Sequence, residues 1–488
     1  MNTVCHRHVY AAMGFTVAYA MAWTIASFLL DPSVPYDAIE ALNWATNAEF
    51  GSPKNPYMVG GIMAVSQLLE PAIPITLYWY LSHFVGVAIG MAGVWLLSRR
   101  VLGNNDIALL SLMSLNLTGV TSFDIIPYND NYLLIMLWPY VFLFFIKAIY
   151  DSAYHWFSLA VVTGLAAMSK YSTFAFLPFM LIYILAVPEA RKAYKSPVFH
   201  LAVLLFLLLL VPNAVWLHDH DYAACNWVQS QLSCRFTLDT AIAFGAVFYP
   251  VLLLPMILTL LGGRWNLPDT AERRAVLFVF VTPLLLILAF FSFHSGGRIT
   301  EWIQPFAILT PVALLSLLNM GPIKSLRGVS YSLLALSIAV WVGYSTVLKQ
   351  NIHGAGAKRA YLKSVSVELN NLWREKYHEP LKFVGGGEFS HWLTFYAPDR
   401  PRIAVLWSNS RKPNIYSANI NARDILDNGA LLVSDPGAVC CQTNFADAIS
   451  DCPAINISET QAYSFVTKDG QTLNLTLAFS PPHRSGPQ

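Results

Sequence analysis

Acidic side chains beside long apolar runs are the first residues in this sequence that could do chemistry. Asp37 stands in the polar segment 31–56, which follows the first apolar run, and Asp130 stands in a very short polar segment between two further runs. Glu40 follows Asp37 by one turn of a helix expected over 36–49, so both carboxylates share a face. A positioned carboxylate can act as a general base toward a sugar or alcohol hydroxyl. The alternative is that these acids are solvated and only stabilise helix ends.

Basic side chains occupy comparable places at the ends of other apolar runs. Lys54 lies in the same polar segment as Asp37, Lys170 in a Met-Ser-Lys-Tyr-Ser turn, and Arg298 in the segment 294–302. Cations at a membrane surface can hold a phosphate and neutralise it as a leaving group. The alternative is that these side chains only extend from a helix end toward water. The residues expected to complete the site for substrate and donor phosphate are Glu40, Tyr128, Tyr171, His294 and Glu301.

Histidine and cysteine residues raise two further possibilities. His218 and His220 alternate with two aspartates and are weak candidates for a divalent metal, although an exposed polar loop is the simpler interpretation. The spacings typical of His/Cys metal sites do not occur, so no cofactor is required, and a divalent metal is the one possibility left open. Cys225 and Cys234 lie in one segment expected on the oxidising side of a membrane, which favours a disulfide over free thiols. A second bridge, of Cys452 with Cys440 or Cys441, is also plausible.

Apolar runs dominate the chain that must position these residues. Of its 488 residues, 56% are hydrophobic and 12% are charged, whereas a soluble domain carries about 25% charged residues. Runs of about 20 apolar residues can cross a bilayer as helices. The predicted fold class is a polytopic α-helical membrane protein in contact with membrane lipids, and a net charge of +2 excludes nucleic acid as a partner. About eleven spans are expected: 9–30, 76–98, 107–123, 131–150, 157–168, 172–187, 198–217, 240–261, 275–293, 304–318 and 329–348.

Lys170 decides how the stretch 157–187 is divided. A lone lysine at the middle of a bilayer costs at least about 2.5–3.5 kcal/mol on insertion scales, so two helices with Lys170 between them are favoured over one. Two helices also place most of the basic loop residues on one side of the membrane, as the positive-inside rule requires. The N-terminus is therefore expected in the cytoplasm and the C-terminus outside it.

The character of the chain changes near residue 350, where short apolar segments alternate with helix-like ones. This alternation predicts a soluble α/β domain over 349–488, after a transmembrane domain over 1–348 that contains the candidate active-site loop 31–56. In the expected helix 36–49, an apolar side could lie flat on the membrane. The expected strands of the soluble domain are Leu381–Val384, Ile403–Leu406 and Leu431–Val433, and its expected helices are 358–375, 388–397 and 422–428.

The order of several short motifs along the chain carries a family resemblance. These motifs are Asp37 with Trp44, Phe50-Gly51 and Lys54-Asn55-Pro56; Tyr128–Leu134; Gly164–Tyr171; Pro212-Asn213 with Trp216; Glu301-Trp302; and Gly387–Pro398. Their order resembles the lipid-linked-sugar glycosyltransferases of the GT-C fold, in the branch of the ArnT-like lipid A transferases and the protein O-mannosyltransferases (glycosyltransferase families 39 and 83). Two departures are visible. Ala38 stands where that family usually has a second acid, a role that Glu40 could take, and the loop prolines are reduced to Asn55-Pro56.

The resemblance implies an inverting transfer of a sugar from a polyprenyl-phosphate donor to an acceptor at the periplasmic face of a bacterial inner membrane. The acceptor would be lipid A, another glycolipid or a glycan. Asp37 would be the general base, Asp130 would order the pocket, and Lys54, Lys170 and Arg298 would bind the carrier phosphate. If the acceptor is a lipid A phosphate, which is already ionised, Asp37 would position the acceptor instead of deprotonating it.

Two other classes of function fit parts of the sequence. A transporter or flippase would use acids in the membrane to bind its substrate or protons. Against it, the ionisable residues gather at one interface instead of near the midplane, and the repeated halves of many transporters are not seen. A membrane scaffold with a binding module at its C-terminus is the third possibility.

Overall fold

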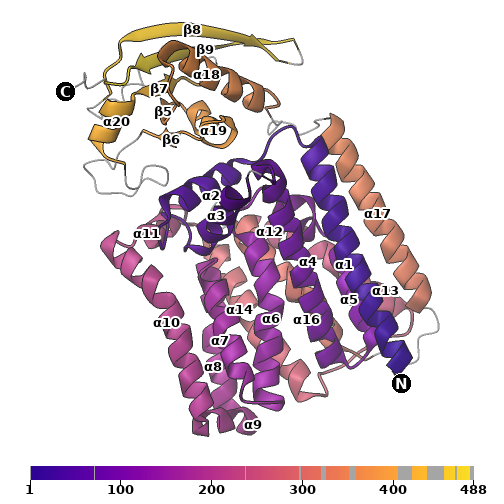
Figure 1. Cartoon of the computed structure of the whole chain (residues 1–488). Coiled ribbons are helices and arrows are strands. Elements are labelled where there is room, and N and C mark those ends of the chain that lie inside the picture. The colour runs from indigo at the N-terminus through magenta and orange to yellow at the C-terminus, as the bar shows by residue number, and fades with distance from the viewer. Residues whose placement is uncertain are drawn as a thin grey trace.

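The computed structural model has a bundle of long helices and a smaller α/β domain over one end of it (Figure 1). Eight helical segments in the described part of the chain are long and apolar enough to cross a membrane, or nine if a bent pair counts as one span. The structure describes residues 2–70, 72–236, 238–295, 298–319, 326–350, 359–404, 420–436, 455–467 and 470–483.

Six of the long segments are single helices and two are composite. The single helices are α1 (Asn2–Leu30), α4 (Ile75–Leu102), α6 (Asn131–Tyr150), α10 (Pro197–Asp219), α14 (Ala271–Phe293) and α17 (Leu326–Gln350). The composite segments join α12 (Asp239–Phe248) to α13 (Leu253–Leu260), and α15 (Ile299–Ile303) to α16 (Thr310–Ser316). Short 3₁₀ helices make these joins, η5 (Tyr249–Leu252) and η6 (Gln304–Leu309), each with a proline near its start.

The expected span 107–123 is not one helix. Helix α5 (Asn105–Leu115) ends after 11 residues, and two 3₁₀ turns follow at Gly119–Thr121 and Phe123–Ile125. Hydroxyl groups take over backbone hydrogen bonds there, because Thr121 donates to the carbonyl of Leu115 and Ser122 to that of Thr118. Side chains that bond to nearby backbone compete with the helix. The apolar character of 107–123 hid this competition. Helices α5 and α7 (His155–Ala167), at two of the eleven expected spans, are shorter than the eight or nine long apolar segments.

The break expected at Lys170 is confirmed. Helix α7 (His155–Ala167) ends before it, and Lys170 has an extended backbone. The chain then runs through η3 (Tyr171–Phe176) into α8 (Leu177–Ala186). A bend of 95° separates this segment from α9 (Pro188–Arg191) and η4 (Lys192–Lys195).

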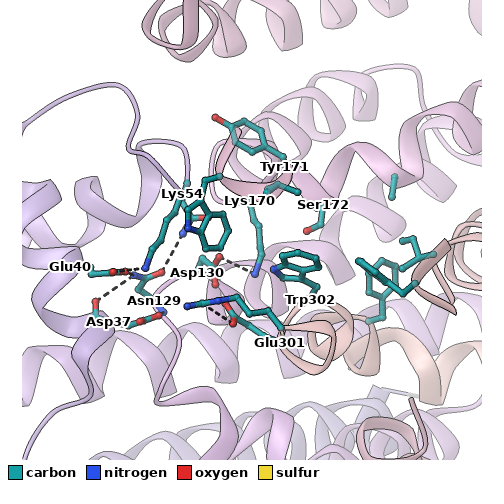
Figure 2. A pocket seen from close by; sticks show the side chains of 18 residues that line it. Asp37, Glu40, Lys54, Asn129, Asp130, Lys170, Tyr171, Ser172, Glu301 and Trp302 are labelled. Carbon is teal, nitrogen blue, oxygen red and sulfur yellow. Dashed lines mark hydrogen bonds and ion pairs between the residues drawn. The ribbon is translucent and has the colours of Figure 1, made fainter. Parts of the chain in front are cut away.

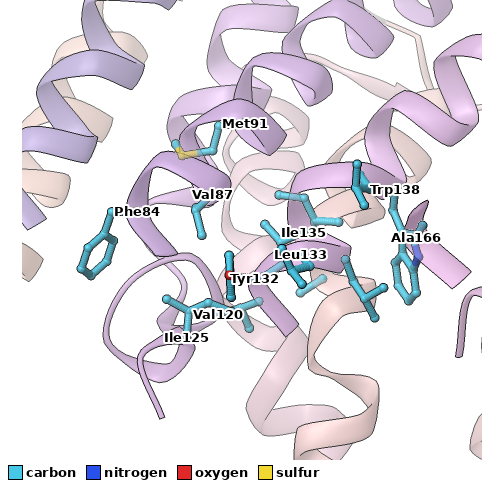
Figure 3. Packing of buried hydrophobic residues seen from close by; sticks show 14 of the residues in the cluster. Phe84, Val87, Met91, Val120, Ile125, Tyr132, Leu133, Ile135, Trp138 and Ala166 are labelled. Atoms are coloured by element: carbon cyan, nitrogen blue, oxygen red, sulfur yellow. The ribbon is translucent and has the colours of Figure 1, made fainter. Parts of the chain in front are cut away.

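A stripe of glycines brings α4 and α6 close together in the centre of the bundle. A Cβ atom on Gly90 would lie 2.1 Å from the carbonyl oxygen of Ile135, and one on Gly86 would lie 2.8 Å from the ring of Tyr132. Small residues allow such close approach between helices in membranes. Figure 3 shows the surrounding packing of side chains from both helices, Val87 and Leu133 among them. This contact fixes the start of α6, which directly follows Asp130.

The C-terminal domain contains a mixed five-stranded sheet, which confirms the expected α/β character. Its strand order is β6-β5-β7-β9-β8, with β5, β6 and β7 parallel and β9 antiparallel to both β7 and β8. The strands are β5 (Phe383–Gly386), β6 (Arg402–Ile403), β7 (Ala430–Val433), β8 (Glu459–Val466) and β9 (Thr472–Ser480), and the helices are α18 (Leu362–Tyr377), α19 (Phe389–Tyr396) and α20 (Ala422–Asn428). The hairpin of β8 and β9 was not expected, and Cys440, Cys441 and Cys452 lie outside the described residues.

Between the bundle and the C-terminal domain lie two short helices, α2 (Tyr36–Asn47) and α3 (Met58–Leu69) (Figure 1). Helix α2 does not lie flat on a membrane, because nine of its 12 residues are buried. It packs against α3 and, on another side, against α19. Helix α11 (Ala223–Ser230) lies at the same end of the molecule, between α10 and the two-residue strand β1 (Ser233–Cys234). Three further strands have two residues each: β2 (Arg264–Trp265), β3 (His294–Ser295) and β4 (Leu318–Asn319).

Candidate active site

A cavity of about 330 Å³ opens at the end of the bundle that carries α2. Segments far apart in the sequence contribute its polar lining, and Figure 2 shows their side chains converging from α2, from the turn after α7 and from α15. The other part of its wall is apolar and includes Ala175, Ile287 and Phe291. The charged lining residues are Asp37, Glu40, Lys54, Asp130, Lys170, Arg298 and Glu301, all of which were predicted as site residues.

Asn129 connects the two acids of α2 to the second acidic segment. Its backbone N–H donates to Oδ2 of Asp37 at 3.2 Å, and its side-chain Nδ2 donates to Oε2 of Glu40 at 3.4 Å. Asn55 in turn donates from Nδ2 to Oδ1 of Asn129 at 3.3 Å. Asn129 and Asn55 were not predicted as site residues, because an asparagine in a polar loop has no distinctive sequence pattern. They fix where the two carboxylates lie in the cavity.

The environment of Asp37 changes its acidity. Burial raises its pKa well above the ordinary value, and the negative charge of Glu40 raises it further, while Lys54 acts in the opposite direction. Desolvation disfavours the charged form of a carboxyl group, and so does a nearby like charge. A carboxylate with a raised pKa is a stronger base, which is the property that a general base needs near neutral pH.

Each of the three cations already has a carboxylate partner in the cavity. Lys54 is paired with Glu40, and Figure 2 shows this contact. Lys170 Nζ lies 2.9 Å from Oδ2 of Asp130 and also donates to Oδ1 of Asn131 at 2.8 Å. The third pair joins Arg298 to Glu301, with 3.2 Å between the guanidinium nitrogen and Oε2. An anionic substrate group would therefore share these cations with the carboxylates of the protein.

Two of the residues predicted to bind the donor do not line this cavity. The backbone carbonyl of Tyr128 accepts a hydrogen bond from Nε2 of His83 at 2.9 Å, and burial raises the pKa of the Tyr128 hydroxyl to about 12. His294, in β3, stacks on the ring of Phe290 with 4.1 Å between ring centroids. Tyr171 does line the cavity, and its hydroxyl donates to Oδ1 of Asn213 at 2.9 Å.

The weak metal candidates are not brought together. His218 is exposed and lies 3.2 Å from a carboxylate oxygen of its neighbour Asp219, while His220 stacks on Trp216. Across the described ranges, no three His, Cys, Asp or Glu side chains are grouped as metal ligands.

The disulfide expected between Cys225 and Cys234 is not formed. Both thiols are free and exposed. The two residues belong to different elements, since Cys225 is on α11 and Cys234 is in β1, where it pairs with His294 of β3. That pairing, which the sequence did not indicate, determines the position of Cys234.

The C-terminal domain holds α2 through several buried contacts. The hydroxyl of Tyr36 lies 2.7 Å from Nδ1 of His391, and burial lowers the pKa of His391 to about 4. Further along α2, Nδ2 of Asn43 donates to Oγ1 of Thr394 at 3.0 Å. Two more hydrogen bonds join Val34 N–H to the Tyr396 hydroxyl at 2.8 Å and Arg402 to Oδ1 of Asn47 at 2.9 Å. The helix that carries Asp37 and Glu40 is thus fixed by a domain more than 300 residues away in the chain.

The helical bundle and the C-terminal α/β domain have the fold of ArnT, the GT-C fold, which the order of motifs had suggested. The structure of ArnT from Cupriavidus metallidurans matches with a TM-score of 0.58 and 14% identity, over 97% of this chain and 98% of that one. The arabinofuranosyltransferase AftD from Mycobacteria matches with a TM-score of 0.51 and 13% identity, over 97% of this chain but 40% of AftD. At these identities the likeness shows the fold.

The sequence itself gives a more local match. Residues 59–216 match the family model described as dolichyl-phosphate-mannose-protein mannosyltransferase. This range runs from α3 to α10 and includes Asp130 and Lys170. No curated protein matches the chain by sequence.

Proposed function

We propose that the protein is an inverting glycosyltransferase that moves a sugar from a polyprenyl-phosphate donor to an acceptor at the same membrane face. The observation that carries this proposal is the composition of one cavity. Asp37 and three cations line its polar part, and apolar side chains line the remainder. A carboxylate base, a phosphate-binding group and an apolar surface are what a lipid-linked sugar donor requires.

The donor would be bound by both parts of the cavity. Lys54, Lys170 and Arg298 would contact the carrier phosphate, and their present carboxylate partners would be partly replaced by phosphate oxygens. Charge-assisted hydrogen bonds from cations to phosphate are stronger than neutral ones. The apolar lining around Phe291 and Phe306 would accommodate the first isoprene units of the carrier.

The transfer step assigns a role to each charged group. Asp37 would take the proton of an acceptor hydroxyl as the hydroxyl oxygen attacks the anomeric carbon of the sugar. The bond from that carbon to the phosphate oxygen would break with inversion, and its electron pair would pass to the phosphate, where Lys54, Lys170 and Arg298 stabilise the added charge. For a phosphate acceptor such as that of lipid A, no proton has to be removed, and Asp37 would orient the acceptor.

A basic residue at the end of the bundle opposite the cavity supports the proposed orientation in the membrane. Arg100 lies in the last turn of α4 and forms ion pairs with Asp151 at 2.8 Å and with Glu272 at 3.4 Å. Basic residues concentrate on the cytoplasmic side of membrane proteins. The cavity and the C-terminal domain would then face the periplasm of a bacterial inner membrane, with the N-terminus in the cytoplasm.

The test is sugar transfer by the purified chain in detergent, with synthetic polyprenyl-phosphate sugars as donors and glycolipid or glycan hydroxyl acceptors. The Asp37→Asn variant should lose about 10²–10⁴-fold in rate, the usual contribution of a general base. Asp106→Asn is a matched control, because Asp106 lies at the opposite end of the bundle beside His8. A rate equal to that of the wild type in Asp37→Asn, with a hydroxyl acceptor, would refute the role of Asp37.

A transporter or flippase is the alternative class. It would move the lipid-linked or polar substrate across proteoliposome membranes without joining a sugar to an acceptor. The cavity lies at one end of the bundle, whereas transporter sites lie near the middle of the membrane. Substrate movement in proteoliposomes, with no transfer product for any donor, would favour this alternative over the enzyme.

A further inference from the structure

An aromatic side chain in the cavity wall lies near two of the three cations. Trp227, on helix α11, lines the cavity and is partly buried. Lys54 Nζ lies 5.7 Å from the centroid of its ring, and Cζ of Arg298 lies 5.3 Å from that centroid. Lys54 comes from the loop before α3, and Arg298 directly precedes α15. Trp227 therefore brings together cations from opposite parts of the chain.

The cations that contact Trp227 are also the more exposed ones. The side chains of Lys54 and Arg298 are 20% and 39% exposed, against 11% for Lys170. Lys170 is fixed by Asp130 and by Oδ1 of Asn131 together. Lys54 and Arg298 are long, flexible side chains, and each has one carboxylate partner in the cavity, Glu40 or Glu301. A further contact is therefore needed to keep the side chains of Lys54 and Arg298 directed at the same point in the cavity.

The indole ring can supply that contact. The face of a tryptophan ring attracts a cation within about 6 Å of its centroid, more strongly than other aromatic rings do. Two like charges beside one ring repel each other, and an anion between them removes this repulsion. A phosphate is such an anion. The carboxylates of Glu40 and Glu301 belong to different elements, so they hold each cation separately, whereas the ring contacts both.

We propose that Trp227 is a positioning residue of the carrier-phosphate site, which holds Lys54 and Arg298 where both can contact the same phosphate. This inference rests on the proposed function, because it assigns the phosphate of the donor to these two cations. It also gives α11 a role: the helix carries the ring to the cavity wall, so the phosphate site is completed by the segment between α10 and α12.

The proposal is tested by binding as well as by activity. Two ligands are compared on the purified full chain in detergent: a short polyprenyl phosphate and the corresponding polyprenol, which lacks the phosphate. In Trp227→Leu, we expect the Kd for polyprenyl phosphate to rise about 5- to 30-fold, from two cation contacts of ordinary strength at a partly exposed site. Trp227→Phe, which keeps a weaker ring, should stay within about threefold of the wild type. The Kd for the polyprenol should not change.

A third variant separates positioning from a general structural role. In the Arg298→Met background, one of the two cations is gone, so Trp227→Leu should weaken polyprenyl phosphate binding less than it does in the wild type. In transfer assays, Trp227→Leu should raise the KM for the donor and lower kcat to a smaller extent, because the two cations bind the phosphate in the ground state and also stabilise the charge that develops on it.

Several results would overturn the proposal. These are unchanged binding of polyprenyl phosphate in Trp227→Leu, an equal loss of polyprenol binding, or full additivity with Arg298→Met. A fall in kcat at unchanged KM would also overturn it, since Trp227 would then not affect how the donor phosphate is bound. If the wild type transfers no sugar, the proposed function fails by itself, and the two binding comparisons still decide the role of Trp227.

Discussion

Replacing Lys170 by methionine should destabilise the protein strongly, because it leaves a buried carboxylate without its cation. The side chains of Asp130 and Lys170 are only 5% and 11% exposed, and their charged atoms are 2.9 Å apart. Oδ1 of Asp130 has no hydrogen-bond partner in the part of the chain that the structure describes, so the lysine is the main stabilising contact of this carboxylate. Removing one partner of a buried ion pair typically costs about 3–5 kcal/mol. Methionine has a similar length and keeps the apolar contacts of the lysine stem.

The double variant Lys170→Met/Asp130→Asn makes this prediction specific. It removes both charges, so the penalty for an unpaired buried charge disappears. A smaller cost remains, because Oδ1 of Asn131 loses the hydrogen bond that it accepts from Lys170 at 2.8 Å. An unsatisfied buried acceptor costs about 1–3 kcal/mol. The double variant should therefore be more stable than Lys170→Met, by about 2 kcal/mol.

Thermal unfolding in one detergent, followed by intrinsic tryptophan fluorescence, gives the order of the Tm values for the wild type, both single variants and the double variant. The expected order places the wild type highest, the double variant next and Lys170→Met below it. A Tm of Lys170→Met equal to that of the wild type would refute the reasoning. So would losses in the two single variants that simply add in the double variant, because groups in direct contact should not be additive.

Two further predictions concern acidity and packing. Because the charge of Glu40 helps to raise the pKa of Asp37, Glu40→Gln should lower that pKa. The transfer rate falls at low pH where Asp37 becomes protonated and inactive, so in this variant the fall should occur at lower pH than in the wild type. A shift of the fall to higher pH would contradict this. A Cβ atom on Gly51 would lie 2.3 Å from the ring of Trp216, whereas nothing lies within 4 Å of one on Gly61 in helix α3. Gly51→Ala should therefore lower stability by about 1–3 kcal/mol, while the control Gly61→Ala should be neutral or stabilising by up to about 1 kcal/mol; equal Tm values for the two variants would contradict the packing argument.

The charged residues of the cavity could be predicted because charge is scarce in the membrane half of the chain. Asp130 and Lys170 stand out between long apolar runs, where an ionisable group is costly unless it has a partner or a function. Asn129 and Trp227 carry no such signal. An asparagine is common in any turn, and a tryptophan near a membrane surface is ordinary in a membrane protein. Their roles depend on distances between segments that the sequence does not contain.

The prediction of secondary structure from the sequence was limited by the same kind of missing information. The segment 107–123 is apolar enough to cross a membrane, but hydroxyl groups near Thr118 end the helix by bonding to its backbone. The hairpin of β8 and β9 was not expected because most residues of β8 are exposed, and its apolar face is short, with only Tyr463 and Phe465 half-buried against the core. The backbone of β8 pairs with that of β9 over eight residue pairs, and this pairing stabilises a strand whose side chains bury little apolar surface.

The docking of α19 on α2 also has a consequence for how the protein is made. Thr394 is added to the growing chain 351 residues after Asn43, its partner across this contact. At ribosomal rates of about 5–20 residues per second, the helix that carries Asp37 waits roughly 20–70 s for the domain that fixes it. Insertion of the bundle into the membrane therefore comes before completion of the site. A domain that is synthesised after the bundle therefore sets the moment at which α2 becomes ordered.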